Sequence, residues 1–292
     1  MSVKEYYYEH LDELSLEKQF HFATRMKNFF NSHDFDDFLE QNKPDTNIAK
    51  LLSKNDCSMV ANYEKRKKYF EKYPDIYGLE AALFRVHHLL KEYRVDIRDE
   101  LTKLYPKNKM YELSDRLMAD GDALITLSSW AVNTICLIEE LFPRDEDMVA
   151  KLGDWVLRLD ADAIDPVLLI YFCTHIIICE SEFYTQNIKN TKHRTMLINL
   201  LNKCKEIILN NIDTISLDPC IEYLVCCRML GVADEETAKK VNEICKNFMQ
   251  NSPYLINYRR DSTPDSYYHT LDGAEHINAL YIMSGLDELN SL

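Results

Sequence analysis

The chain has 292 residues and 46% of them are hydrophobic, which is enough for a sizeable core in one large domain or two ordinary ones. The formal net charge is −14, and an acidic surface repels the phosphates of nucleic acids and anionic lipid head groups. We therefore exclude nucleic acid and membrane surfaces as expected partners.

The sequence predicts a cytoplasmic protein. No apolar run approaches the roughly 18 residues of a membrane-spanning helix, and the first residues, Met1–Tyr6, lack an apolar signal segment. The nine cysteines lie mostly in apolar helical runs, and none has the Cys-x-x-Cys spacing. We therefore expect buried, reduced thiols.

The first 105 residues predict irregular helical hairpins. Stretches rich in Leu, Glu, Lys, Ala and Met favour helix. No run has the β-branched alternation between glycine turns that is typical of strands. Helices are expected over residues 4–32, 35–41, 57–72, 78–93 and 96–104.

From residue 106 to residue 292 the pattern is more regular. A long apolar helix is expected over Tyr111–Leu141, and further apolar helices begin near Asp165, Asp218 and Asp265, at intervals of 53 and 47 residues. Asp165 and Asp218 each precede a proline, which is a typical N-cap followed by the first helical residue. Half-polar helices lie between the apolar ones, so the pattern indicates a helical-hairpin repeat of about 50 residues.

This repeat predicts an all-α protein in one compact domain. In an α/α toroid, the apolar helices would form an inner ring and their N-terminal ends would meet at one mouth. An open α-solenoid is the alternative, and it would leave those helices half covered. The nearly all-round hydrophobicity of Val167–Ile178 favours the buried inner position and thus the toroid.

Three potential metal ligands lie at or near the predicted starts of two apolar helices. Asp218, Cys220 and His269 offer an oxygen, a sulfur and a nitrogen. If the helix starts are neighbours, the three side chains would share one Zn²⁺ and leave its fourth position open, as in catalytic zinc sites. Such an ion would deprotonate a substrate thiol or polarise a bound group. The alternative is a helix cap, a buried thiol and a histidine at the rim.

The segments Asp218-Pro219-Cys220 and Tyr268-His269-Thr270 resemble the zinc ligands of protein prenyltransferase β subunits. In that family an Asp-x-Cys at one inner helix and the His of a Tyr/Phe-His-Thr at the next hold the metal. The motifs cover the last third of the chain, and the repeat covers the last two-thirds. The resemblance implies a toroid, zinc, a diphosphate pocket and a second helical subunit. The chain departs from the family in having six glycines and no basic residue at positions 210–216; Arg259-Arg260 precedes the histidine instead.

A second constellation needs no metal. His269, Asp272 and His276 have the spacing of one helical face. His175 lies in an apolar run, with Glu182 two turns further along the same predicted face. If these faces line a central cavity, imidazoles and carboxylates on apolar walls suit general acid–base catalysis. The alternative is that they are core polar residues with satisfied hydrogen bonds.

Two classes of function follow. The first is an enzyme, related to transferases or cyclases, that acts on a small molecule or peptide in a pocket at the N-terminal ends of the inner helices. The acidic run Asp160–Asp165 could serve such a cyclase, although a loop followed by an N-cap also explains it. The second is a non-catalytic helical-repeat scaffold that binds a peptide or protein partner.

Overall fold

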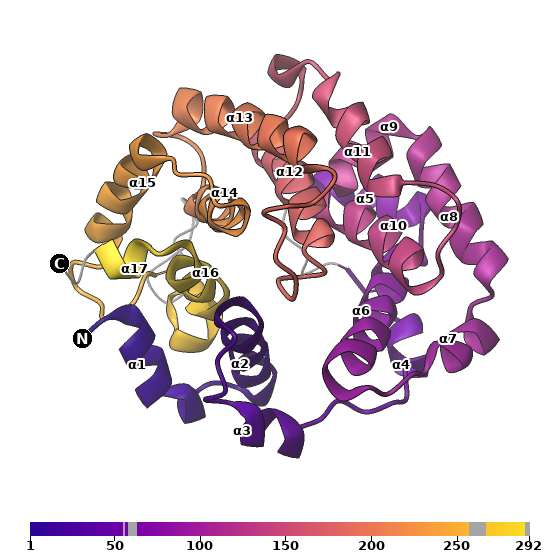
Figure 1. The fold of residues 1–292 in the computed structure, drawn as a ribbon, viewed down its shortest axis with the longest axis horizontal. Helices are drawn as coiled ribbons and strands as arrows, with labels where there is room; N and C mark the ends of the chain where they lie inside the picture. Colours follow the sequence, from indigo (N-terminus) through magenta and orange to yellow (C-terminus); the bar gives the residue numbers. More distant parts are fainter. Residues whose placement is uncertain (55, 58–62, 257–266, 290–292) are drawn as a thin grey trace. The chain divides into compact units, whose positions relative to one another are not determined.

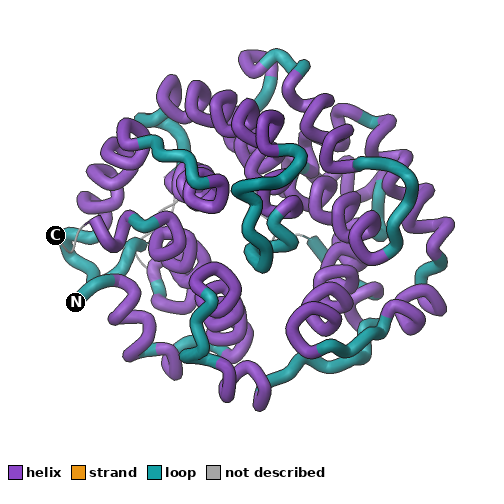
Figure 2. The backbone as a smooth tube through the Cα atoms, viewed as in Figure 1, coloured by secondary structure: helices purple, strands orange, loops and turns teal. Residues whose placement is uncertain are grey.

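The computed structural model describes residues 1–54, 56–57, 63–256 and 267–289. Over these ranges the protein has seventeen α-helices, three short 3₁₀ helices and no strand, as Figure 2 shows. The prediction of an all-α protein is confirmed. No single helix over these ranges is long and apolar enough to cross a membrane. The helices Gly121–Leu127 and Ser129–Leu141 reach that length and apolar composition only when they are taken together, and the chain bends sharply between them.

Contacts along the chain divide it into two compact units. Unit 1 comprises residues 1–43 and 180–292, and unit 2 comprises residues 44–179. The predicted boundary near residue 105 falls inside unit 2. The α-helices of unit 1 are α1 (Val3–Glu9), α2 (Leu16–Phe30), α3 (Asp36–Gln41), α13 (Arg194–Asn211), α14 (Leu217–Leu230), α15 (Glu235–Phe248), α16 (Leu271–Ser284) and α17 (Leu286–Leu289).

The centre of unit 1 is formed by α14, α16 and α2. Helix α14 packs against α16, and α16 packs against α2 (Figure 1). Most residues of α14 and α16 are buried, which accounts for their nearly all-round apolar character. The helix predicted near Asp265 begins later, at Leu271, because Thr270 is its N-cap and accepts a hydrogen bond from the Gly273 amide at 3.0 Å. Asp265 itself lies outside the described residues.

The N-terminal segment is bound to the C-terminal helices of unit 1. The amides of Val3 and Lys4 donate to the Asp287 carboxylate at 2.9 and 3.0 Å, and the Tyr7 hydroxyl donates to the Leu271 carbonyl at 3.1 Å. These contacts, made across more than 260 residues of chain, place α2 beside α16. The side chains of α2 therefore join those of α16 in one polar cluster.

Unit 2 is built around the pair α6 and α10, which pack against each other. Its helices are α4 (Ala49–Leu52), α5 (Tyr63–Lys72), α6 (Ile76–Tyr93), α7 (Arg98–Leu104), α8 (Lys107–Ala119), α9 (Gly121–Leu127), α10 (Ser129–Leu141), α11 (Met148–Leu157) and α12 (Pro166–Glu180). The last residue of α12, Glu180, is where the chain re-enters unit 1.

The single helix predicted over Tyr111–Leu141 is wrong, since that stretch holds most of α8 and all of α9 and α10. Asp120 ends the first and caps the second, where its Oδ1 accepts from the Ala123 amide at 3.2 Å. Ser128 then turns the chain with φ 51°, and α9 and α10 meet at 101°. The buried Ser128 hydroxyl donates to the Leu168 carbonyl at 2.7 Å, so a tertiary contact stabilises a bend that the apolar pattern does not indicate.

Helix α12 begins as predicted, next to Asp165, and ends before Glu182. Asp165 precedes Pro166, and its Oδ1 accepts from the Val167 amide at 3.0 Å, so the acidic run ends in an N-cap. The helix stops at Glu180, and Glu182 has a left-handed backbone with φ 49°. The predicted shared helical face of His175 and Glu182 is therefore wrong.

Gly78 is a glycine that the packing of unit 2 requires. A Cβ built at this position of α6 would lie 2.6 Å from the Leu51 carbonyl oxygen and 2.8 Å from that of Leu52. Gly78→Ala would normally stabilise a helix by up to about 1 kcal/mol. Here we expect it to destabilise the protein by about 1–3 kcal/mol, because backbone atoms must move apart. Urea unfolding checks this, and a variant as stable as the wild type would contradict the close packing of α4 on α6.

Candidate active site

The structure describes all three predicted zinc ligands. Cys220 is fully buried on α14, its Sγ donates to the Ser216 carbonyl at 3.4 Å, and burial, followed by the charge of Asp218, raises its pKa to about 12. His269 ends the 3₁₀ helix Tyr267–His269. Among the described residues, no group of three or more His, Cys, Asp or Glu side chains is placed to hold a metal ion. Zinc stays a prediction, and we derive no step through it.

The structure does not place His269, Asp272 and His276 together on one helical face. His269 precedes the first residue of α16, so the helical spacing does not include it. Asp272 accepts hydrogen bonds from the Ser15 amide and the Tyr267 hydroxyl, both at 2.7 Å. These contacts link α16 to the N-cap of α2, so Asp272 is a structural residue in this arrangement. His276 lies beside another histidine, His21, with ring centroids 5.8 Å apart.

His21 and Glu275 form a histidine–carboxylate dyad. Glu275 on α16 is fully buried, and its Oε1 and Oε2 lie 2.7 and 2.8 Å from Nδ1 of His21 on α2. Because a carboxylate only accepts, Nδ1 carries the proton and Nε2 carries the lone pair. The His21 side chain is 34% exposed, so the imidazole reaches solvent. Lys18, on the preceding turn of α2, places its Nζ 3.5 Å from Glu275 Oε2.

At neutral pH the His21 imidazole is uncharged and the Glu275 carboxylate carries a negative charge. Partial burial lowers the pKa of His21 below its ordinary value, although the charge of Glu275 opposes this. Burial acts to raise the pKa of Glu275, but His21, Lys18 and Arg25 together keep it below its ordinary value. A neutral imidazole oriented by an ionised carboxylate is the arrangement of a general base.

A second histidine–carboxylate pair lies beside the dyad. Nε2 of His276 is 3.4 Å from Oδ1 of Asp218, and the two side chains are 35% and 19% exposed. Asp218 lies in the first turn of α14, and its contact with His276 was not predicted, because the sequence analysis assigned the two residues to different sites. The His21 ring lies 5.8 Å from that of His276, so the two histidine–carboxylate pairs are neighbours.

The sequence interpretation missed His21 and Glu275. A signal for Glu275 was present, since it is the one acidic residue between Gly273 and Ser284 in an otherwise apolar helix, directly before His276. His21 gave no such signal in its half-polar helix. Its partner lies 254 residues away in the sequence, so only the tertiary structure shows the pair.

His175, in unit 2, belongs to a different cluster from the one predicted. Its Nδ1 lies 2.8 Å from Oδ1 of Asn133, whose Nδ2 donates to Glu80 at 2.9 Å. Burial raises the pKa of Glu80 to about 7. The cluster links α6, α10 and α12, and it gives His175 a carboxyl partner through Asn133.

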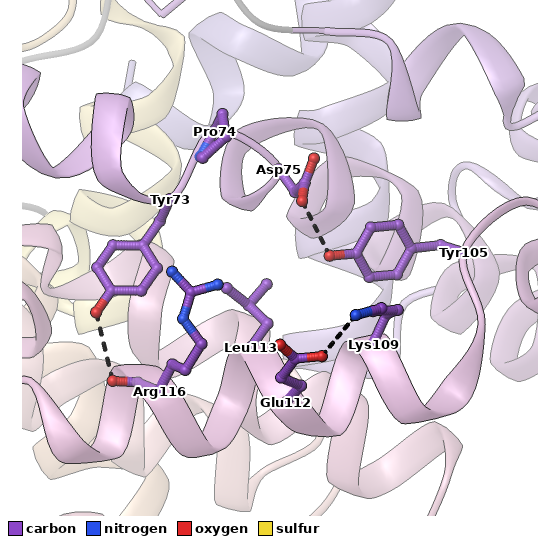
Figure 3. Close-up of a pocket in the computed structure, with 8 residues that line it drawn as sticks. All are labelled: Tyr73, Pro74, Asp75, Tyr105, Lys109, Glu112, Leu113 and Arg116. Carbon is purple, nitrogen blue, oxygen red and sulfur yellow. Dashed lines mark hydrogen bonds and ion pairs between the residues drawn. The ribbon is translucent and has the colours of Figure 1, made fainter.

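A pocket of about 280 Å³ also lies in unit 2 (Figure 3). The Tyr105 hydroxyl donates to Asp75 at 3.1 Å, and Lys109 pairs with Glu112 at 2.8 Å. Its charged groups thus largely pair with each other, and it holds no histidine, so acid–base chemistry fits it less well than the dyad. The lining residues are Tyr73, Pro74, Asp75, Tyr105, Lys109, Glu112, Leu113 and Arg116.

Comparisons of the chain with protein-family models, with curated proteins and with solved structures find no match.

Proposed function

We propose that unit 1 carries an acid–base active site and that the protein is an enzyme acting on a small organic molecule. The observation that carries this proposal is the hydrogen bonding of His21 Nδ1 to the fully buried Glu275 carboxylate at 2.7 and 2.8 Å. This contact fixes the tautomer and orientation of the imidazole, and it leaves Nε2 as the basic atom on a partly exposed ring.

In the proposed reaction, Nε2 of His21 removes a proton from the substrate or from a water molecule beside it. The buried Glu275 carboxylate stabilises the imidazolium that forms. His276 returns a proton at a second position of the same molecule, since the two rings are 5.8 Å apart. The buried Cys220 thiol, with its raised pKa, is a poor nucleophile, so water or the substrate itself supplies the attacking atom.

The proposal also includes the fold around the site and the cellular location of the protein. An α/α toroid remains the arrangement that the alternation of apolar and half-polar helices favours, and the prenyltransferase-like chemistry remains a separate prediction that requires zinc. A cytoplasmic location is supported by the nine cysteines, which are all free and buried. The alternative function is a helical-repeat scaffold for a peptide or protein partner, in which His21 and Glu275 would serve packing alone.

A substrate panel tests the proposal. Small carbonyl compounds, esters and phosphate esters are incubated with the full chain in D₂O, and proton NMR records both hydrolysis and exchange of carbon-bound protons. We expect turnover of at least one class and expect His21→Gln to lower it about 10²–10⁴-fold. His33→Gln is the matched control, because His33 also pairs with a carboxylate, Asp36 at 2.8 Å, but is 79% exposed. Turnover that depends equally on both histidines, or on neither, would contradict the proposal.

A further inference from the structure

Arg25 has a buried donor without a partner in the described structure. It lies one turn after His21 on α2, and over residues 1–54, 56–57, 63–256 and 267–289 its Nη1 is buried and finds no hydrogen-bond acceptor. Burying a charged donor without an acceptor is costly, and natural proteins rarely do so without a reason. A group that arrives with a ligand is one such reason.

The guanidinium of Arg25 belongs to the proposed active site. Its positive charge contributes to lowering the pKa of both His21 and Glu275. On its other side it lies over the ring of Tyr184, 5.5 Å from the centroid. A ligand that contacts Arg25 would therefore also be close to the His21 imidazole.

Tyr184 is held over Arg25 by an unusual turn. Glu182, Phe183 and Tyr184 follow α12 with φ values of 49°, 55° and 75°, in the left-handed region that bulky side chains rarely adopt. The Tyr184 amide donates to the Ser181 hydroxyl at 2.9 Å and closes the turn. Strained backbone of this kind persists where surrounding contacts impose it, often at binding sites. Burial raises the pKa of Tyr184 well above its ordinary value, so its hydroxyl stays a donor.

We infer that Arg25, with Tyr184, binds a carboxylate of the substrate and holds the rest of the molecule against His21 and His276. The planar guanidinium presents parallel N–H groups that match a carboxylate. The negative charges of Glu222 and Asp218 contribute, after burial, to raising the pKa of Tyr184. These negative groups repel a phosphate dianion more strongly than a carboxylate monoanion. The inference rests on the proposed function, because it assigns a substrate class to the same site.

Acetate and inorganic phosphate are the probes, each added to the full chain at constant ionic strength. The His21 ring signals, assigned by comparison with His21→Gln, are followed by NMR. We expect saturable shifts with acetate, and we expect Arg25→Met to weaken acetate binding about tenfold or more, which corresponds to ~1.4 kcal/mol. The matched control is Arg116→Met, because Arg116 also stacks on a ring, that of Tyr73 at 5.1 Å, but lies in unit 2.

Acetate binding that Arg25→Met weakens and Arg116→Met leaves unchanged would support the inference. Unchanged binding in Arg25→Met, or tighter binding of phosphate than of acetate, would overturn it. If Arg25→Met does not fold, Arg25→Lys keeps the charge without the planar fork and should still bind acetate several-fold more weakly than the wild type.

The two proposals fail in different ways. If acetate binding depends on Arg25 but turnover in the substrate panel does not depend on His21, the carboxylate site stands and the acid–base proposal falls. If turnover depends on His21 and neither acetate binding nor turnover depends on Arg25, the acid–base proposal stands and the carboxylate inference falls.

Discussion

Glu275→Gln is expected to lower turnover about 10²–10⁴-fold while the protein remains folded. Glutamine has nearly the shape of glutamate, so the packing of α16 against α2 is retained. Its amide can donate to His21 Nδ1, which would move the imidazole proton to Nε2 and remove the lone pair that acts as the base. The neutral amide also no longer stabilises the imidazolium formed during the reaction.

The measurement is kcat for the substrate found in the panel, together with the ¹⁵N chemical shifts of His21, which report the tautomer directly. We expect the wild type to carry the proton on Nδ1 and the variant to carry it on Nε2. Asp36→Asn is the matched control, since Asp36 pairs with His33 at 2.8 Å on an exposed part of unit 1. Full activity in Glu275→Gln would show that the buried dyad is a packing feature.

The second large effect expected is a dependence of stability on pH that comes from Glu80. Burial raises the pKa of this carboxyl from 4.5 to about 7, although the hydrogen bond from Asn133 opposes the change. Between these two values the folded state holds a proton that the unfolded state has released. The free energy of unfolding therefore falls as the pH rises from about 4.5 to about 7, by about 3.5 kcal/mol in total at ~1.4 kcal/mol per pH unit.

Glu80→Gln removes the ionisable group and keeps the side-chain shape. We expect the variant to be about 3.5 kcal/mol more stable than the wild type at pH 8 and nearly equal to it at pH 4.5. Urea unfolding at several pH values measures both proteins, with Glu71→Gln as the control because Glu71 is an exposed glutamate of the same unit. A stability difference between Glu80→Gln and the wild type that does not change with pH would contradict a raised pKa for Glu80.

The errors in the predicted sites have local causes. Asp218 and Cys220 are two residues apart on α14, so their side chains project about 200° apart around the helix axis. One therefore approaches His276 and the other is buried in the core. Glu182 lies seven residues after His175, a spacing that shares one face of a continuous helix, but the chain leaves the helix after Glu180. The real partner of His175 is Asn133, 42 residues earlier.

Local patterns in the sequence specify the all-α class, most helices, the N-cap at Asp165 and the burial of the apolar helices. These features depend on periodicity and on capping residues, which are local properties of the chain. The tertiary structure alone decided which polar side chains meet. His21 and Glu275 are separated by 254 residues, and their contact depends on the packing of α2 against α16. No local pattern specifies that contact, because it is fixed by how the apolar faces of distant helices bury one another.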